Sequence, residues 1–159
     1  MDRPTVYIET SVVSYLAARP SRHPETARKQ ATTREWWARR SGFRLFASEY
    51  VHREAVRGNP EMVRRRLGYL STIEVIEGGP EATLLAAALM RDVPLPTRAG
   101  TDALHIALAA VTGVAYLLTW NCRHIANPAL APRLRRACRA RGYELPVLCT
   151  PGDLPGGWM

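Results

Sequence analysis

The chain has 159 residues, a length that suits one globular domain with a sizeable core and leaves little room for two. Its hydrophobic fraction of 47% and charged fraction of 23% exclude wholesale disorder. The net charge of +8 favours a polyanionic partner such as nucleic acid, although Lys29 is the only lysine and an arginine-rich composition also arises from coding bias.

Short apolar runs with strand character alternate along the chain with longer segments of helical period. The runs with strand character cover residues 5–9, 44–47, 72–76, 115–119 and 146–149. This alternation is typical of a parallel sheet covered on both faces by helices. We therefore predict an α/β fold of three layers, α/β/α, around a mostly parallel sheet of four to five strands.

The helices are expected between these strands, and several have recognisable first residues. A short helix begins near Ser11, a second spans roughly 24–41, and Ser48 caps a third. Asn59 and Pro60 open the fourth, Pro80 the fifth, Thr101 caps the sixth, and the last spans roughly 129–141. The expected organisation is one domain over residues 1–150, followed by an irregular tail over residues 151–159.

Residues 103–120 are apolar over nearly the length that crosses a bilayer. Polar residues and Gly113 interrupt this stretch, and the sequence after it is rich in strand formers. A buried helix that ends near Gly113 and leads into a buried strand explains the pattern better than a membrane span. No membrane association is therefore expected.

The three cysteines, Cys122, Cys138 and Cys149, lie far apart and form no CxxC pair. Their spacing and odd number argue against a disulfide framework and against a thiolate zinc site. The N-terminal sequence also lacks the basic segment and long apolar stretch of a secretory signal. We expect a cytoplasmic protein.

Polar side chains gather where the expected strands end. Glu9 closes the first strand, Thr119 and Asn121 close the fourth, and Asp102 falls at the start of a helix. Glu54 lies nearly two turns along the helix that Ser48 caps. In an open parallel sheet, ligands bind beyond the carboxyl ends of the strands, where the winding reverses direction.

A cluster of these carboxylates would be costly without a cation. Ligation by carboxylate and amide oxygens, with no thiolate and no necessary histidine, favours Mg²⁺ or Mn²⁺ over zinc. Such ions polarise a scissile phosphate and lower the pKa of an attacking water. The pattern therefore predicts phosphoryl chemistry, with nucleic acid as the substrate.

Four motifs in this order resemble those of the PIN-domain nucleases, particularly the VapC-type toxins of toxin–antitoxin pairs. The motifs are "YIETSVVSYL", "SEYVHREAVRGNP", "TDALHIALAA" and "YLLTWNCRHIANP", and together they span most of the chain. The resemblance implies a PIN-like fold. It also implies a metal-dependent endoribonuclease that hydrolyses RNA, an antitoxin partner and a homodimer.

Carried over residue by residue, the resemblance places the family's first acid at Glu9, its second at Glu54 and its third at Asp102, and these three residues would hold Mg²⁺ or Mn²⁺. Asn121 occupies the fourth acidic position and is counted with the catalytic residues.

The expected positioning residues are Thr10, Ser11, Thr119 and Arg123. Arg123 stands where many relatives carry a further Asp. The alternative is a catalytically weakened PIN-like module that binds RNA or protein, which Asn121 and Arg123 motivate.

Purely structural roles remain compatible with the sequence for several of these residues. Glu9 is also compatible with a helix cap or an arginine partner, and Asp102 with an ordinary first-turn acid. Glu49 competes with Glu54 for the second motif. His105 fits a core histidine with one hydrogen-bond partner as well as a substrate contact, and His124 is equally open.

Two arginine-rich segments favour RNA binding or a solvated helix face equally well. The first is the run at residues 64–66, and the second covers the last expected helix.

Overall fold

The computed structural model describes residues 2–154, and within them five strands form one parallel sheet in the order β3-β2-β1-β4-β5. The strands are β1 (Thr5–Ile8), β2 (Arg44–Ser48), β3 (Glu74–Ile76), β4 (Tyr116–Leu118) and β5 (Val147–Cys149). The predicted α/β class and parallel sheet are confirmed.

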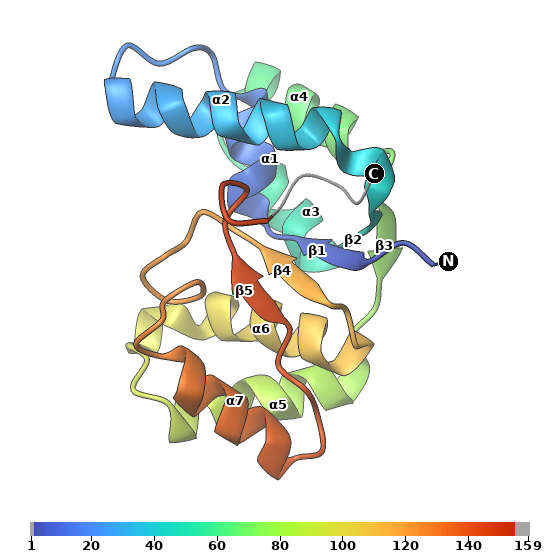
Figure 1. Cartoon of the computed structure of the whole chain (residues 1–159), viewed down its shortest axis with the longest axis vertical. Coiled ribbons are helices and arrows are strands. Elements are labelled where there is room, and N and C mark those ends of the chain that lie inside the picture. The colour runs from blue at the N-terminus through green and yellow to red at the C-terminus, as the bar shows by residue number, and fades with distance from the viewer. Residues whose placement is uncertain (1, 155–159) are drawn as a thin grey trace.

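Helices cover both faces of the sheet, with α1–α4 on one side and α5–α7 on the other (Figure 1). The α-helices are α1 (Thr10–Ala17), α2 (Pro24–Ala38), α3 (Glu49–Ala55), α4 (Pro60–Leu70), α5 (Gly79–Asp92), α6 (Gly100–Thr112) and α7 (Ala131–Ala140). Two 3-10 helices, η1 (Arg40–Gly42) and η2 (Thr97–Ala99), precede β2 and α6. The layers therefore match the predicted sandwich.

Side-chain caps confirm two of the predicted helix starts. The Ser48 side chain accepts the Val51 N–H at the start of α3, and the Asn59 side chain accepts two backbone N–H groups at the start of α4. The prediction for Thr101 is wrong. The 3-10 turn η2 runs directly into α6, so the helix begins at Gly100 and Thr101 lies inside its first turn.

The second and last helices are shorter than predicted. The second ends at Ala38, because η1 forms before the chain enters β2. The last begins at Ala131 and ends at Ala140, where the chain turns toward β5 through Gly142 at a φ of +85°.

The apolar stretch at residues 103–120 divides as expected. Helix α6 ends at Thr112, and Gly113 takes the left-handed conformation with a φ of +80° before β4 begins. In the described part of the chain, no helix combines the length and apolar character that crossing a membrane requires.

The chain continues past residue 150 as a turn, and Leu154 is buried in the hydrophobic core. The remainder of the predicted irregular tail, residues 155–159, lies outside the described residues.

Strand β1 lies at the centre of the sheet, between β2 and β4. The chain moves outward from β1 to β2 and β3 and then crosses to β4 and β5, so the winding reverses beside β1. Ile8 pairs with Leu118 at the last position of the β1–β4 ladder. The residues that follow these two strands therefore emerge side by side, at the place where open α/β sheets bind ligands.

Candidate metal centre

Glu9 follows β1 directly, and the residue is only 6% exposed. The Ser11 and Thr119 hydroxyls both donate to its Oε1, and the distance from Thr119 Oγ1 is 2.6 Å. Glu9 makes no side-chain cap to α1, and among the described residues it has no arginine partner. Neither a helix cap nor an ion pair with an arginine therefore accounts for the position of Glu9.

Glu54 lies in the last turn of α3 and turns back over the same edge of the sheet. Its Oε1 accepts hydrogen bonds from Thr10 Oγ1 at 2.7 Å and from His105 Nε2 at 2.6 Å. Burial alone would raise the pKa of Glu54. The hydrogen bonds from His105 and Thr10 outweigh burial and hold the pKa below its ordinary value, so the carboxylate is ionised at neutral pH.

The competing second-motif acid lies elsewhere. Glu49 is at the start of α3 with a side chain that is 52% exposed, and it pairs with Arg53 one turn along the same helix. Among the described residues it belongs to no group of side chains close enough together to hold a metal ion. Glu54, and not Glu49, is therefore the α3 carboxylate beside Glu9.

Glu9, Glu54 and His105 form such a cluster, with one possible ligand atom from each residue and all three atoms within 4.8 Å of one another. In each carboxylate, the hydrogen bonds of the described residues go to Oε1 and leave Oε2 without a donor. Two neighbouring carboxylates that each keep one oxygen without a donor among the described residues suit a divalent cation. The residues present fit the hard, oxygen-binding metal that the sequence predicts.

The sequence motifs did not indicate the partners of His105. This side chain is fully buried, with Nε2 on Glu54 and Nδ1 at 2.7 Å from the Tyr7 hydroxyl. It therefore has two polar partners, where one was expected. The signal in the sequence was Tyr7 itself, because a tyrosine inside a buried strand needs a partner for its hydroxyl.

Asp102 lies in the first turn of α6, one turn before His105. Its Oδ2 lies 3.0 Å from His124 Nδ1, in a pair that is partly buried. The structure does not place Asp102 in the cluster with Glu9 and Glu54.

The loop after β4 supports the site through its backbone. Thr119 is fully buried and accepts the Asn121 N–H, while Ser11 accepts the Trp120 N–H at 2.8 Å. Asn121 Oδ1 accepts the backbone N–H groups of Arg123 and His124, at 3.2 and 3.0 Å. Both lone pairs of that oxygen are thus engaged in shaping the loop.

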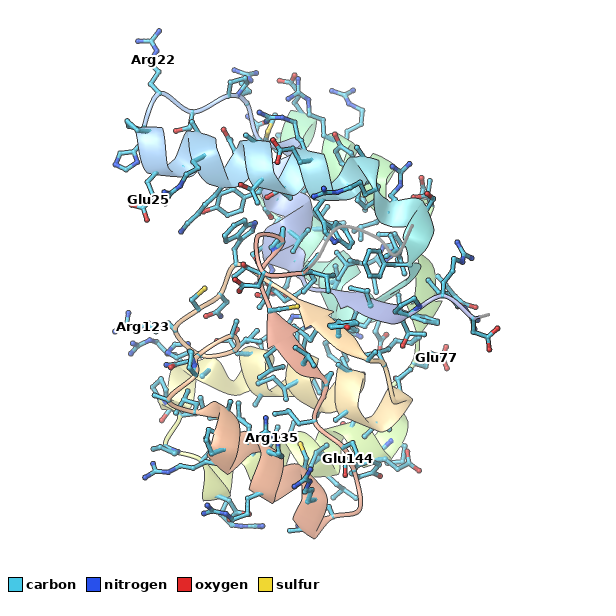
Figure 2. All side chains as sticks on the ribbon, viewed as in Figure 1. Arg22, Glu25, Glu77, Arg123, Arg135 and Glu144 are labelled. Atoms are coloured by element: carbon cyan, nitrogen blue, oxygen red, sulfur yellow. The ribbon has the colours of Figure 1, made fainter. Side chains whose placement is uncertain are left out.

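Arg123 projects outward from the same loop (Figure 2) and is exposed. Of the predicted positioning residues, Thr10, Ser11 and Thr119 contact the two carboxylates directly, whereas the Arg123 side chain makes no hydrogen bond or ion pair with the described residues.

Neither protein-family models nor curated proteins give a match to this sequence. Among solved structures, the chain is similar to one in the crystal structure of VapBC2 from Rickettsia felis bound to a DNA fragment from their promoter. The two chains are 15% identical with a TM-score of 0.52, and the match covers 79% of this chain and 95% of the other. At this identity the likeness shows that the two proteins share a fold.

Proposed function

We propose that this protein is a nuclease that uses Mg²⁺ or Mn²⁺ to hydrolyse RNA, and that it is the toxin of a toxin–antitoxin pair. The observation that carries the proposal is the pair of carboxylates at the sheet edge. Glu9 and Glu54 come from separate segments of the chain, and each is held through one oxygen with the other left without a donor.

A divalent cation at this place would polarise a phosphate and lower the pKa of an attacking water. Glu9 and Glu54 would hold it through Oε2, and Asp102 would approach it from the start of α6. Thr10, Ser11 and Thr119 fix the two carboxylates in advance, so they need not reorganise when the cation binds.

Asn121 shapes the loop after β4 in this proposal, because its oxygen already accepts two backbone N–H groups. Arg123 is exposed on the same loop and carries a positive charge that suits a phosphate of the substrate. The net charge of +8 supports an RNA substrate in the same general way.

The proposed partner is an antitoxin protein. One solved structure with the same fold is that of VapBC2 bound to a DNA fragment from their promoter. We propose an analogous pairing for this chain, with two copies of the chain forming a homodimer.

The proposal is tested by incubating the purified protein with a mixed single-stranded RNA and Mn²⁺, Mg²⁺ or a chelator. We expect cleavage with either metal and none with the chelator. Glu9→Gln and Asp102→Asn should reduce cleavage to the chelator background, because each removes a charge that holds the cation. Glu49→Gln is the matched control on α3 and should cut at the unaltered rate.

Undiminished cutting by Glu9→Gln would contradict the assignment of the site. A protein that binds RNA without cutting it under any metal would favour the alternative, a binding module with this fold. The engagement of Asn121 by the backbone is the observation that favours this second candidate, because the fourth acidic position then offers no free oxygen to a metal.

A further inference from the structure

A buried chain of hydrogen bonds runs beneath the two carboxylates, from the end of β2 to α6. Ser48 Oγ lies 2.7 Å from the Tyr7 hydroxyl, which lies 2.7 Å from His105 Nδ1, and His105 Nε2 lies 2.6 Å from Glu54 Oε1. Ser48, Tyr7 and His105 are all fully buried. Three polar side chains at such depth need every hydrogen bond satisfied.

The direction of donation along these hydrogen bonds follows from the groups at the two ends. At one end, the Val51 N–H donates to Ser48 Oγ, so the Ser48 hydroxyl is free to donate its own proton to Tyr7. At the other end, the Glu54 carboxylate only accepts, so His105 Nε2 must carry a proton. The Tyr7 hydroxyl then donates to His105 Nδ1, and each group has a partner.

The opposite direction leaves a group without a partner. A proton on His105 Nδ1 would donate to the Tyr7 oxygen, and Tyr7 would then donate to Ser48. The Ser48 oxygen would accept from both Tyr7 and the Val51 N–H, and its own proton would have no acceptor among the hydrogen bonds of the described residues. Burial also raises the pKa of Tyr7 above its ordinary value, so the phenol keeps its proton.

We propose that His105 is a positioning residue for Glu54, with a proton on Nε2 that faces Glu54 and an unprotonated Nδ1 that accepts from Tyr7, and that it does not ligate the metal. This proposal rests on the proposed function, because that function supplies the divalent cation that Glu54 would bind. A protonated Nε2 has no lone pair for a cation. Together with Thr10, His105 occupies Oε1 of Glu54 and leaves Oε2 without a donor among the described residues.

The tautomer is measured by ¹⁵N NMR of the histidine ring nitrogens in the full chain, with His105 assigned by comparison with the His105→Gln variant. We expect Nε2 to show the shift of a protonated ring nitrogen and Nδ1 that of an unprotonated one. Both shifts should persist when Mg²⁺ is added. A proton on Nδ1, or an Nε2 resonance that takes the shift of a metal-bound nitrogen, would overturn the proposal.

Tyr7→Phe removes the hydroxyl that donates to His105 Nδ1 and keeps the aromatic ring. Glu54 still requires a proton on Nε2 in this variant, whereas Nδ1 loses its donor, so we expect the ¹⁵N shift of Nδ1 to change. We also expect Mn²⁺ to bind about tenfold more weakly in calorimetry, the scale of effect that the partners of metal ligands have. Tyr116→Phe on β4 is the matched control, because the Tyr116 hydroxyl makes no hydrogen bond with the described residues. The His105 Nδ1 shift and the Mn²⁺ affinity of this control should equal those of the unaltered chain.

An unchanged Nδ1 shift together with an unchanged Mn²⁺ affinity in Tyr7→Phe would also overturn the proposal. If Tyr7→Phe does not fold, the tautomer of the unaltered chain decides the matter by itself. That measurement needs no RNA cleavage, so a chain that fixes the proton on Nε2 without cutting RNA would retain the positioning role and lose the nuclease function. A protein that cuts RNA with His105 bound to the metal would retain the nuclease function and lose the positioning role.

Discussion

The two carboxylates at the sheet edge are each held by two donors from different segments of the chain. Glu9 is held by Ser11 from α1 and by Thr119 from the end of β4. Glu54 is held by Thr10 from α1 and by His105 from α6. This arrangement fixes the direction of each free oxygen before any cation arrives, which is what a preorganised metal site requires.

Thr119→Val tests this arrangement at a fully buried residue of nearly unchanged shape. The change removes a donor to Glu9 and leaves the Asn121 N–H without its acceptor. We expect a loss of about 1–3 kcal/mol in the free energy of unfolding, measured by urea denaturation. Mn²⁺ affinity, measured by calorimetry, should fall about tenfold.

Thr119→Ser retains the hydroxyl and serves as the control for this variant. It should recover most of the lost Mn²⁺ affinity. A Thr119→Val protein that binds Mn²⁺ as tightly as the unaltered chain would show that the hydroxyl plays no part in holding Glu9.

The cysteines offer a second prediction at this scale. Burial raises the pKa of the Cys138 thiol to about 11 and that of Cys149 to about 12, whereas Cys122 is exposed on the loop after β4. Both buried thiols therefore stay protonated and inert at neutral pH. We expect a maleimide to label Cys122 alone in the folded protein and all three cysteines in denaturant, as counted by mass spectrometry. Rapid labelling of Cys138 in the folded chain would contradict the packing of α7.

The position of a residue within its own strand or helix could be predicted from the sequence. Glu9 at a strand end and Asp102 in a first turn are local features. The link from Tyr7 to His105 was not accessible, because it joins residues 98 positions apart and depends on how α6 packs across β1. The pairing of Asp102 with His124 depends on the path of the loop after β4 for the same reason.

Among the elements, α4 shows how arginines can serve the fold. Arg66 Nε donates to the carbonyl of Ala55 at the end of α3, and Arg65 donates to the carbonyl of Ala17 at the end of α1. Cationic side chains at these positions satisfy carbonyls that a helix end leaves unpaired. Two residues of this run, Arg65 and Arg66, thus contact the ends of neighbouring helices.

Asn59→Ala removes the side chain that accepts the N–H groups of Glu61 and Met62 at the start of α4. We expect the free energy of unfolding to fall by about 1 kcal/mol, as measured by urea denaturation. Metal binding should be unchanged, because α4 contributes no residue to the cluster. Asn59→Ser, which keeps an N-cap side chain, should cost only a fraction of this amount, and an equal loss in both variants would rule out the cap as the cause.

Element type was predictable from periodicity, whereas element boundaries were less so. Asn59 and Ser48 cap helices as predicted, because the free N–H groups of a helix start select such side chains. The start of α6 was misplaced at Thr101, since the 3-10 turn η2 continues without a break into the helix. Nothing in a propensity scale separates these two kinds of helical turn.

For the whole molecule, the order of the strands decides where the chemistry can occur. Strands β1 and β4 are far apart in the sequence yet adjacent in the sheet, and Glu9 N–H donates to the Leu118 carbonyl at 3.0 Å. Hydrophobic pattern predicts a parallel sheet but does not fix this order. We expected polar residues to gather at one edge of the sheet because parallel sheets bind ligands there and because the four motifs resemble those of a known family. The β1–β4 register then brought Glu9 beside Thr119.

The measurement that tests the central claim most directly is a calorimetric titration of the full chain with Mn²⁺, compared with Glu9→Gln, Glu54→Gln and the α3 control Glu49→Gln. Glu9 and Glu54 are the two carboxylates of the cluster, so each of these substitutions should weaken Mn²⁺ binding at least tenfold, while Glu49→Gln binds as the unaltered chain does. Equal Mn²⁺ affinity in all four proteins would contradict a metal centre at this edge of the sheet.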